Sequence, residues 1–184
     1  PNTAVVRALL AGGAAADAED ARGMTPLMHA VACGNRAACV LLLDHGADAN
    51  AKDHDGVTAL HNAAKHDRAD IAALLLARGA DPLAKHGRCS TPLHFAAGFG
   101  SPACIDMLLD SGGVPVDVLG GGKQTPLHFA VHNRHQVCAD QLMQRGADPN
   151  AVSVWGTPLQ MALNNNDLEM EAVLRRAAQR RGAV

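Results

Sequence analysis

Aromatic residues are scarce in this chain of 184 residues, which contains three phenylalanines, one tryptophan and no tyrosine. A single globular core of this size ordinarily relies on aromatic side chains for buried area and shape. Nearly half of the residues are nonetheless apolar, and most of these are alanine, leucine and valine. This composition favours a series of small, thin cores between closely packed helices over one large core.

A strong charge of either sign and a long apolar run are also missing. The net charge is −2, whereas a nucleic-acid-binding chain usually carries a basic stripe. We interpret the one basic cluster, at the C-terminal end, as the solvated end of a helix. No apolar run approaches the roughly 18 residues of a membrane-spanning helix, and no signal peptide opens the chain. We therefore expect neither nucleic acid nor membrane as a partner.

Paired cysteines are absent as well. The five cysteines are odd in number, and no two of them have CxxC spacing, so neither a disulfide framework nor a zinc site is indicated. Free thiols are typical of a reducing compartment. We expect an intracellular, cytoplasmic protein, with the nucleus as the alternative.

What the chain does contain is an internal repeat. One phrase occurs five times and begins at Thr25, Thr58, Thr91, Thr125 and Thr157, so the spacings are 33, 33, 34 and 32 residues. Its clearest copies read Thr-Pro-Leu-His-Phe-Ala, at 91–96 and 125–130. A second phrase, Leu-Leu-Leu-x-x-Gly-Ala-Asp, follows at 41–48 and 74–81, with further copies at 142–148 and, degraded, at 108–112.

Two phrases in a fixed order at this period resemble the ankyrin-repeat family over the whole chain. The resemblance implies an all-α solenoid of stacked helix-turn-helix units joined by β-hairpin-like loops. Local chemistry agrees with it. Threonine is a good N-cap, proline fits the first helical turn, and Gly46, Gly79 and Gly146 suit the left-handed end of the second helix. Asp20, Asp53 and the glycines that follow them provide turn residues for the loops.

We expect one domain covering 1–184. Full repeats are assigned to 20–52, 53–85, 86–119 and 120–152. Residues 1–19 match only the second half of a repeat, so we expect the natural protein to continue upstream. Residues 153–184 are assigned to a capping repeat, because Arg175 stands where internal repeats place leucine and a terminal repeat needs a polar outer face.

Several residues that suggest chemistry have a structural interpretation instead. His61, His94 and His128 occupy the histidine position of the first phrase, which in the family makes hydrogen bonds within and between repeats. His132 and His135 lack further ligands for zinc. Cys104 and Cys138 fit core positions, whereas Cys89 replaces a loop glycine and is expected to be exposed. The segment 120–125 is not a phosphate loop, because Asp117 stands where the motif requires its first glycine and Gln124 follows Lys123 in place of serine or threonine. We therefore predict no catalytic residue, no metal and no cofactor.

Ankyrin arrays usually meet their partners through the loop tips and the exposed side of the first helices. Carried over position by position, the expected partner-binding residues are Arg22, Met24, Cys33, His54, Asp55, Val57, Lys65, His66, Arg88, Ser90, Phe99, Gln124, His132, Asn133, Trp155, Asn164 and Asn165. Phe99 is expected to be exposed, while Phe95 and Phe129 are assigned to the core. For Trp155, an exposed binding position and a packed position under the cap remain equal alternatives.

The predicted function is a non-catalytic, monomeric protein–protein interaction module that binds a partner protein or peptide on its concave face. The alternative is a substrate-positioning or regulatory domain of a larger enzyme whose catalytic domain lies outside this chain. A narrower hypothesis concerns Asn50 and Asn150, because their segments resemble those that asparaginyl hydroxylases modify in ankyrin proteins, although the same segment is also the repeat consensus.

Overall fold

The computed structural model describes residues 2–182, and within them the chain forms α-helices and one 3₁₀ turn but no strand. This confirms the predicted all-α class. The helices are α1 (Thr3–Ala11), α2 (Pro26–Ala32), α3 (Arg36–Asp44), α4 (Ala59–Lys65), α5 (Ala69–Ala77), α6 (Pro92–Phe99), α7 (Pro102–Asp110), α8 (Pro126–His132), α9 (Gln136–Gln144), α10 (Pro158–Asn164) and α11 (Leu168–Gly182), with the 3₁₀ turn η1 at Gly121–Lys123.

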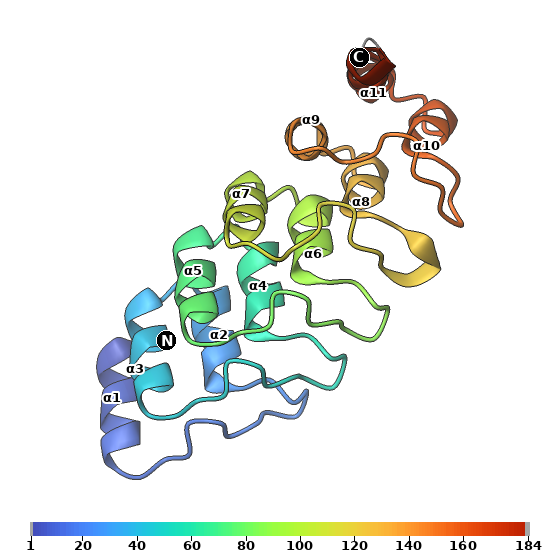
Figure 1. Cartoon of the computed structure of the whole chain (residues 1–184). Coiled ribbons are helices and arrows are strands. Elements are labelled where there is room, and N and C mark those ends of the chain that lie inside the picture. The colour runs from blue at the N-terminus through green and yellow to red at the C-terminus, as the bar shows by residue number, and fades with distance from the viewer. Residues whose placement is uncertain (1, 183–184) are drawn as a thin grey trace.

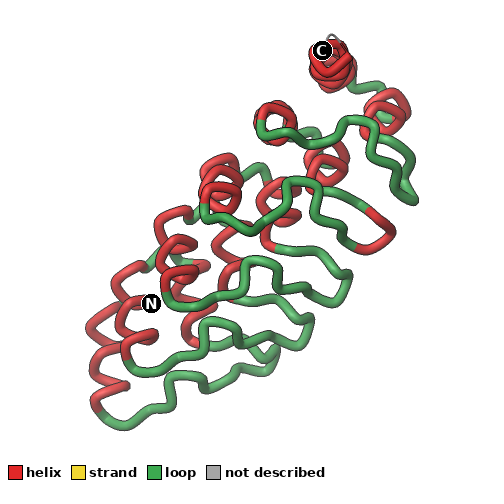
Figure 2. Tube along the Cα trace, in the orientation of Figure 1, coloured by secondary structure: helices red, strands yellow, loops and turns green. Residues whose placement is uncertain are grey.

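The helices stack in two parallel rows (Figure 1). An inner row contains α2, α4, α6, α8 and α10, and an outer row contains α1, α3, α5, α7, α9 and α11. Long loops run from each outer helix to the next inner helix and project to one side of the stack (Figure 2). The exposed side of the inner helices and the tips of these loops together form the surface that we call the concave face.

Each inner helix begins at the threonine of the repeated phrase. Thr25, Thr58, Thr91, Thr125 and Thr157 all have extended backbone angles at the N-cap position, and all but Thr58 are followed by a proline in the first turn. The Thr157 hydroxyl, for example, accepts a hydrogen bond from the Gln160 N–H at 3.2 Å. A cap of this kind stabilises a helix by about 1 kcal/mol.

The core lies between the two rows and continues from one repeat to the next. Leu27, Leu60, Leu93 and Leu127, at the same place in successive inner helices, are fully buried. Alanines such as Ala63 and Ala96 are fully buried too, and their small size lets neighbouring helices approach closely. Because no helix pair covers its own apolar side, stability comes from the stacking of repeats.

Buried histidines connect the repeats through hydrogen bonds. The Nδ1 atom of His94 accepts the Thr91 N–H at 3.2 Å, and its Nε2 atom lies 3.0 Å from the Gln124 carbonyl oxygen in the next repeat. Since Nδ1 is the acceptor, Nε2 carries the proton and donates to that carbonyl. His61 and His128 make the same bonds to the Ser90 and Gly156 carbonyls, each at 3.1 Å. These contacts confirm the structural role predicted for the three histidines.

The loops are β-like turns that are also linked between repeats. Asp20 accepts the N–H groups of Arg22 and Met24, and the Arg22 carbonyl accepts the His54 N–H of the next loop at 3.0 Å. Gly23 has φ +75°, which favours glycine. Cys89 takes the corresponding place in its own loop with φ +60°, so a side chain is held there in a left-handed conformation.

The cysteines divide into buried and exposed groups. Cys39, Cys104 and Cys138 are buried, whereas Cys33 and Cys89 are exposed, as predicted for Cys89, Cys104 and Cys138. Burial raises the pKa of the Cys104 thiol to about 12 and that of the Cys138 thiol to about 11. The reactive thiolate is therefore disfavoured at these two positions by both burial and a raised pKa.

The buried histidines make stability depend on pH in a defined window. Burial lowers the pKa of His61 and of His94 to about 4. An unfolded chain, with histidine near its ordinary value of 6.5, binds more protons than the folded one below that pH. The free energy of unfolding should therefore be unaffected above pH 6.5 and should fall as the pH drops from 6.5 toward about 4, by up to about 1.4 kcal/mol per pH unit for each histidine.

Urea unfolding of the wild type and of His94→Gln, at about pH 7.5 and about pH 5, tests this window. Glutamine is a matched replacement, because Gln160 takes the same position in α10 and its Oε1 accepts the Thr157 N–H at 2.9 Å. The variant should lose less stability between the two pH values than the wild type. An equal loss in the two proteins would show that His94 is not responsible.

Native-state labelling with a maleimide should modify Cys33 and Cys89 first. Both are exposed, whereas Cys39, Cys104 and Cys138 are buried, so the latter three should react only as fast as the protein opens locally. The measurement is peptide mass spectrometry over a time course, with urea-unfolded protein as the control in which all five react. Labelling of Cys104 as fast as Cys89 in the native state would contradict the buried placement.

Candidate functional site

The concave face carries most of the residues that the sequence predicted as partner contacts. Apart from Trp155, eleven of the predicted partner-binding residues are exposed in the structure. These are Arg22, Cys33, His54, Asp55, Lys65, His66, Arg88, Phe99, His132, Asn133 and Asn164. Trp155 is exposed as well, and Met24, Val57 and Asn165 are half-buried. Whether these residues bind a partner stays a prediction.

Two residues of the predicted set do not project from this surface. Ser90 and Gln124 are 2% and 8% exposed, so the expectation of exposed side chains there was wrong. Each directly precedes the threonine of a repeat, and each backbone carbonyl accepts the hydrogen bond from the buried histidine of the preceding repeat. This hydrogen bond holds the residue before the threonine against the preceding repeat, and its side chain is buried there. Met24 and Val57 stand at the same position in their repeats, and they are half-buried.

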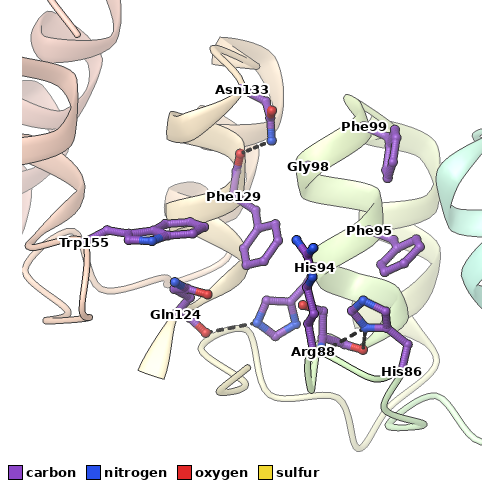
Figure 3. Close-up of a pocket in the computed structure, with 11 residues that line it drawn as sticks. His86, Arg88, His94, Phe95, Gly98, Phe99, Gln124, Phe129, Asn133 and Trp155 are labelled. Carbon is purple, nitrogen blue, oxygen red and sulfur yellow. Dashed lines mark hydrogen bonds between the residues drawn. The ribbon is translucent and has the colours of Figure 1, made fainter. Parts of the chain in front are cut away.

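Phe95 and Phe129 were assigned to the core, and this was only partly right. Both rings pack against the core but are only half-buried, and both line a pocket on the concave side. Phe129 lies between α8 and α6, whereas Phe95 lies on the other side of α6 (Figure 3), where its ring centroid is 4.9 Å from that of His61. The same position is exposed at His29 in α2 but buried at Asn62 in α4 and Met161 in α10, so the sister repeats give no uniform signal for its exposure.

Phe95, Phe99, Phe129 and Trp155 line a cavity of about 310 Å³ on the concave face, together with Gly98 of α6 (Figure 3). We call this cavity the aromatic groove. The Phe95 and Phe99 ring centroids lie 5.8 Å apart on the α6 side, and those of Phe129 and Trp155 lie 5.6 Å apart on the opposite side. The groove gathers all four of the chain's phenylalanine and tryptophan residues.

Trp155 combines the two alternatives that the sequence left open. Its indole stacks on the His132 ring with centroids 5.0 Å apart, and its Nε1–H donates to the Gln124 side-chain oxygen at 3.2 Å when that amide is oriented to satisfy both of its groups. The side chain is nevertheless 39% exposed. Trp155 is therefore held in a fixed orientation by packing while one part of the ring remains available to a ligand.

Two positively charged side chains lie close to the aromatic groove. The Arg88 side chain extends from its loop toward the groove (Figure 3), and the Lys65 ammonium lies 5.2 Å from the centroid of the Phe99 ring. No aspartate or glutamate is among the described residues that line the groove. Within residues 2–182 neither Arg88 nor Lys65 forms an ion pair, so both cations face solvent.

No metal or cofactor site emerges from the described part of the chain, where no three His, Cys, Asp or Glu side chains converge on a point. His132 and His135 diverge, since His132 stacks on Trp155 while the His135 Nε2 atom contacts the Gly98 carbonyl at 3.1 Å. Asn50 bonds to the next repeat through the Gly79 carbonyl and the Asp81 N–H. Among residues 2–182, none of the helices has the length and apolar character needed to cross a membrane.

Comparison with known proteins agrees with this architecture. The family model described as ankyrin repeats in three copies matches residues 1–86 and 84–153. No curated protein matches the chain in sequence. Ankyrin repeats are in general protein–protein interaction modules, and they are typically non-catalytic. With a family model that covers most of the sequence and a structure of stacked helix pairs, the chain belongs to the ankyrin-repeat family.

Proposed function

We propose that this chain is a non-catalytic interaction module that holds a partner protein or peptide on its concave face, across the aromatic groove. The observation that carries the proposal is the exposure of large aromatic side chains in a groove on a rigid scaffold. Phe99 is 51% exposed, although burying such a ring in a protein core would be favourable. Exposed aromatic residues that line a groove are typical of binding hot spots.

The contrast between scaffold and surface supports the same proposal. The buried positions are nearly uniform from repeat to repeat, as in the leucine series from Leu27 to Leu127. The concave positions vary among the repeats, and the residue eight places after the threonine is Cys33, His66, Phe99, Asn133 or Asn165. A uniform scaffold with a variable face suits recognition of one particular partner. We propose further that the chain acts as a monomer inside the cell, which agrees with its unpaired cysteines.

Truncation of the groove aromatics should separate binding from folding. Phe99→Ala and Trp155→Ala should each weaken partner binding by about 2 kcal/mol or more, which is roughly a thirtyfold loss of affinity. Phe99→Ala should leave the melting temperature nearly unchanged because the ring is half exposed. Trp155→Ala should lower it measurably, since that indole also packs on His132 and Phe129.

The matched control is Val137→Ala on α9. Val137 is 70% exposed and belongs to the outer row of helices, so its truncation also removes exposed apolar surface, but on the opposite side of the array. Each immobilised protein is used to capture partners from cells of the source organism, and the affinity of each captured protein is then titrated. Partners that bind Phe99→Ala and Trp155→Ala as tightly as wild type would show that the concave groove is not the binding site.

A further inference from the structure

Gly98 leaves a gap in an otherwise regular row of side chains. In the other repeats the residue seven places after the threonine is Ala32, Lys65, His132 or Asn164. The side chain at this position lies against the next repeat, as Lys65 lies over Phe99. A Cβ atom at Gly98 would stand 3.2 Å from Cδ1 of Phe129 and 3.5 Å from Nδ2 of Asn133. Glycine at position 98 therefore lets the Phe129 ring of the next repeat pack closely against α6.

The glycine is costly where it stands. It lies inside α6 (Pro92–Phe99), and a glycine in the interior of a helix costs roughly 1 kcal/mol relative to alanine. Its φ is not in the left-handed region, so the backbone does not require glycine. The glycine instead allows the close approach of the Phe129 ring, which forms one wall of the aromatic groove.

The size and charge of the groove indicate what enters it. A cavity of about 310 Å³ lies at the low end of small-molecule sites, which span roughly 300–1,000 Å³, and suits a side chain of a longer ligand. Arg88 and Lys65 stand at the groove with no carboxylate partner among the described residues. A guanidinium in this position pairs best with a carboxylate, in a bidentate contact.

A protein segment fits these features better than a nucleic acid does. Single-stranded nucleic acid is held by a groove of many cations that follows its backbone, whereas the chain as a whole carries a net charge of −2. Two cations beside one apolar groove match a short segment with a local negative charge.

We infer that the aromatic groove recognises a peptide segment in which one bulky apolar side chain enters beside Phe99, Phe129 and Trp155, and in which neighbouring carboxylates pair with Arg88 and Lys65. The inference rests on the proposed function, because it names the kind of partner that the concave face selects. Affinity comes from burial of the apolar side chain, and the two cations select acidic segments and speed their association.

The experiment is selection of a random peptide library, displayed on phage, against the whole immobilised chain. Enriched peptides should share a Phe, Trp, Leu or Met within a few residues of Asp or Glu. A synthetic peptide of the enriched sequence should bind with a salt-sensitive affinity, and replacing its acidic residues by Asn and Gln should weaken binding about tenfold.

Two variants place this binding in the groove. Gly98→His adds at the groove the residue that α8 has at the same position, and it should reduce affinity at least about tenfold. Because its Cβ would stand 3.2 Å from Cδ1 of Phe129, its melting temperature is compared with that of the wild type. The double change Lys65→Glu with Arg88→Glu should turn the selection toward peptides with Lys or Arg. Val137→Ala, on the outer row, should leave both affinity and selection unchanged.

The outcomes separate this inference from the proposed function. Enriched peptides that are lost in Gly98→His but contain no acidic preference would overturn the inference and leave a concave-face interaction module in place. The inference would also be overturned, and the interaction module left in place, if no groove-dependent peptide is enriched while proteins are still captured through Phe99 and Trp155. Groove-dependent binding of a thymidine oligonucleotide in place of any peptide would overturn both.

Discussion

The hydrogen bond from a buried histidine to a carbonyl of the following repeat is the contact on which the rest of the structure depends. It ties the start of one inner helix to the loop of the next, at His61, His94 and His128. The imidazole must stay neutral to accept the threonine N–H and donate to the carbonyl at once, and burial keeps it so by lowering its pKa. This repeated contact fixes how α4, α6 and α8 meet the loops that follow them, whereas the fully buried Met28 takes the same position in α2.

With repeats held in this way, the surface is free to vary without cost to the fold. The aromatic groove forms where two repeats contribute Phe95, Phe99 and Phe129 and the last loop adds Trp155. Gly98 lets the Phe129 ring approach α6 closely, although a glycine weakens the helix locally. The buried histidines and leucines stabilise the scaffold. This stability allows a glycine and exposed rings where binding requires them, which is a common relation between scaffold and site.

Much of the fold was predictable from the sequence because threonine caps, proline at the first turn and glycine at helix ends act locally. The helices, the histidine contacts and the exposure of Phe99 and Cys89 follow from such signals and from the repeat register. The burial of Ser90 and Gln124 did not follow, since it depends on a hydrogen bond to another repeat. The groove was missed because Phe95 and Phe129 look like core residues within their own helices, and only the stacking of neighbouring repeats leaves each ring half-buried on the concave side.

Trp155 provides a direct test that the concave groove is where a partner binds. It is the one tryptophan of the chain, it lines the groove, and its indole is partly open to solvent. Titration with a tryptophan-free partner or selected peptide, followed by tryptophan emission, should shift the emission to shorter wavelength as water leaves the ring. The midpoint of this shift should equal the dissociation constant obtained by calorimetry. Calorimetric saturation with unchanged Trp155 emission would contradict binding in the groove.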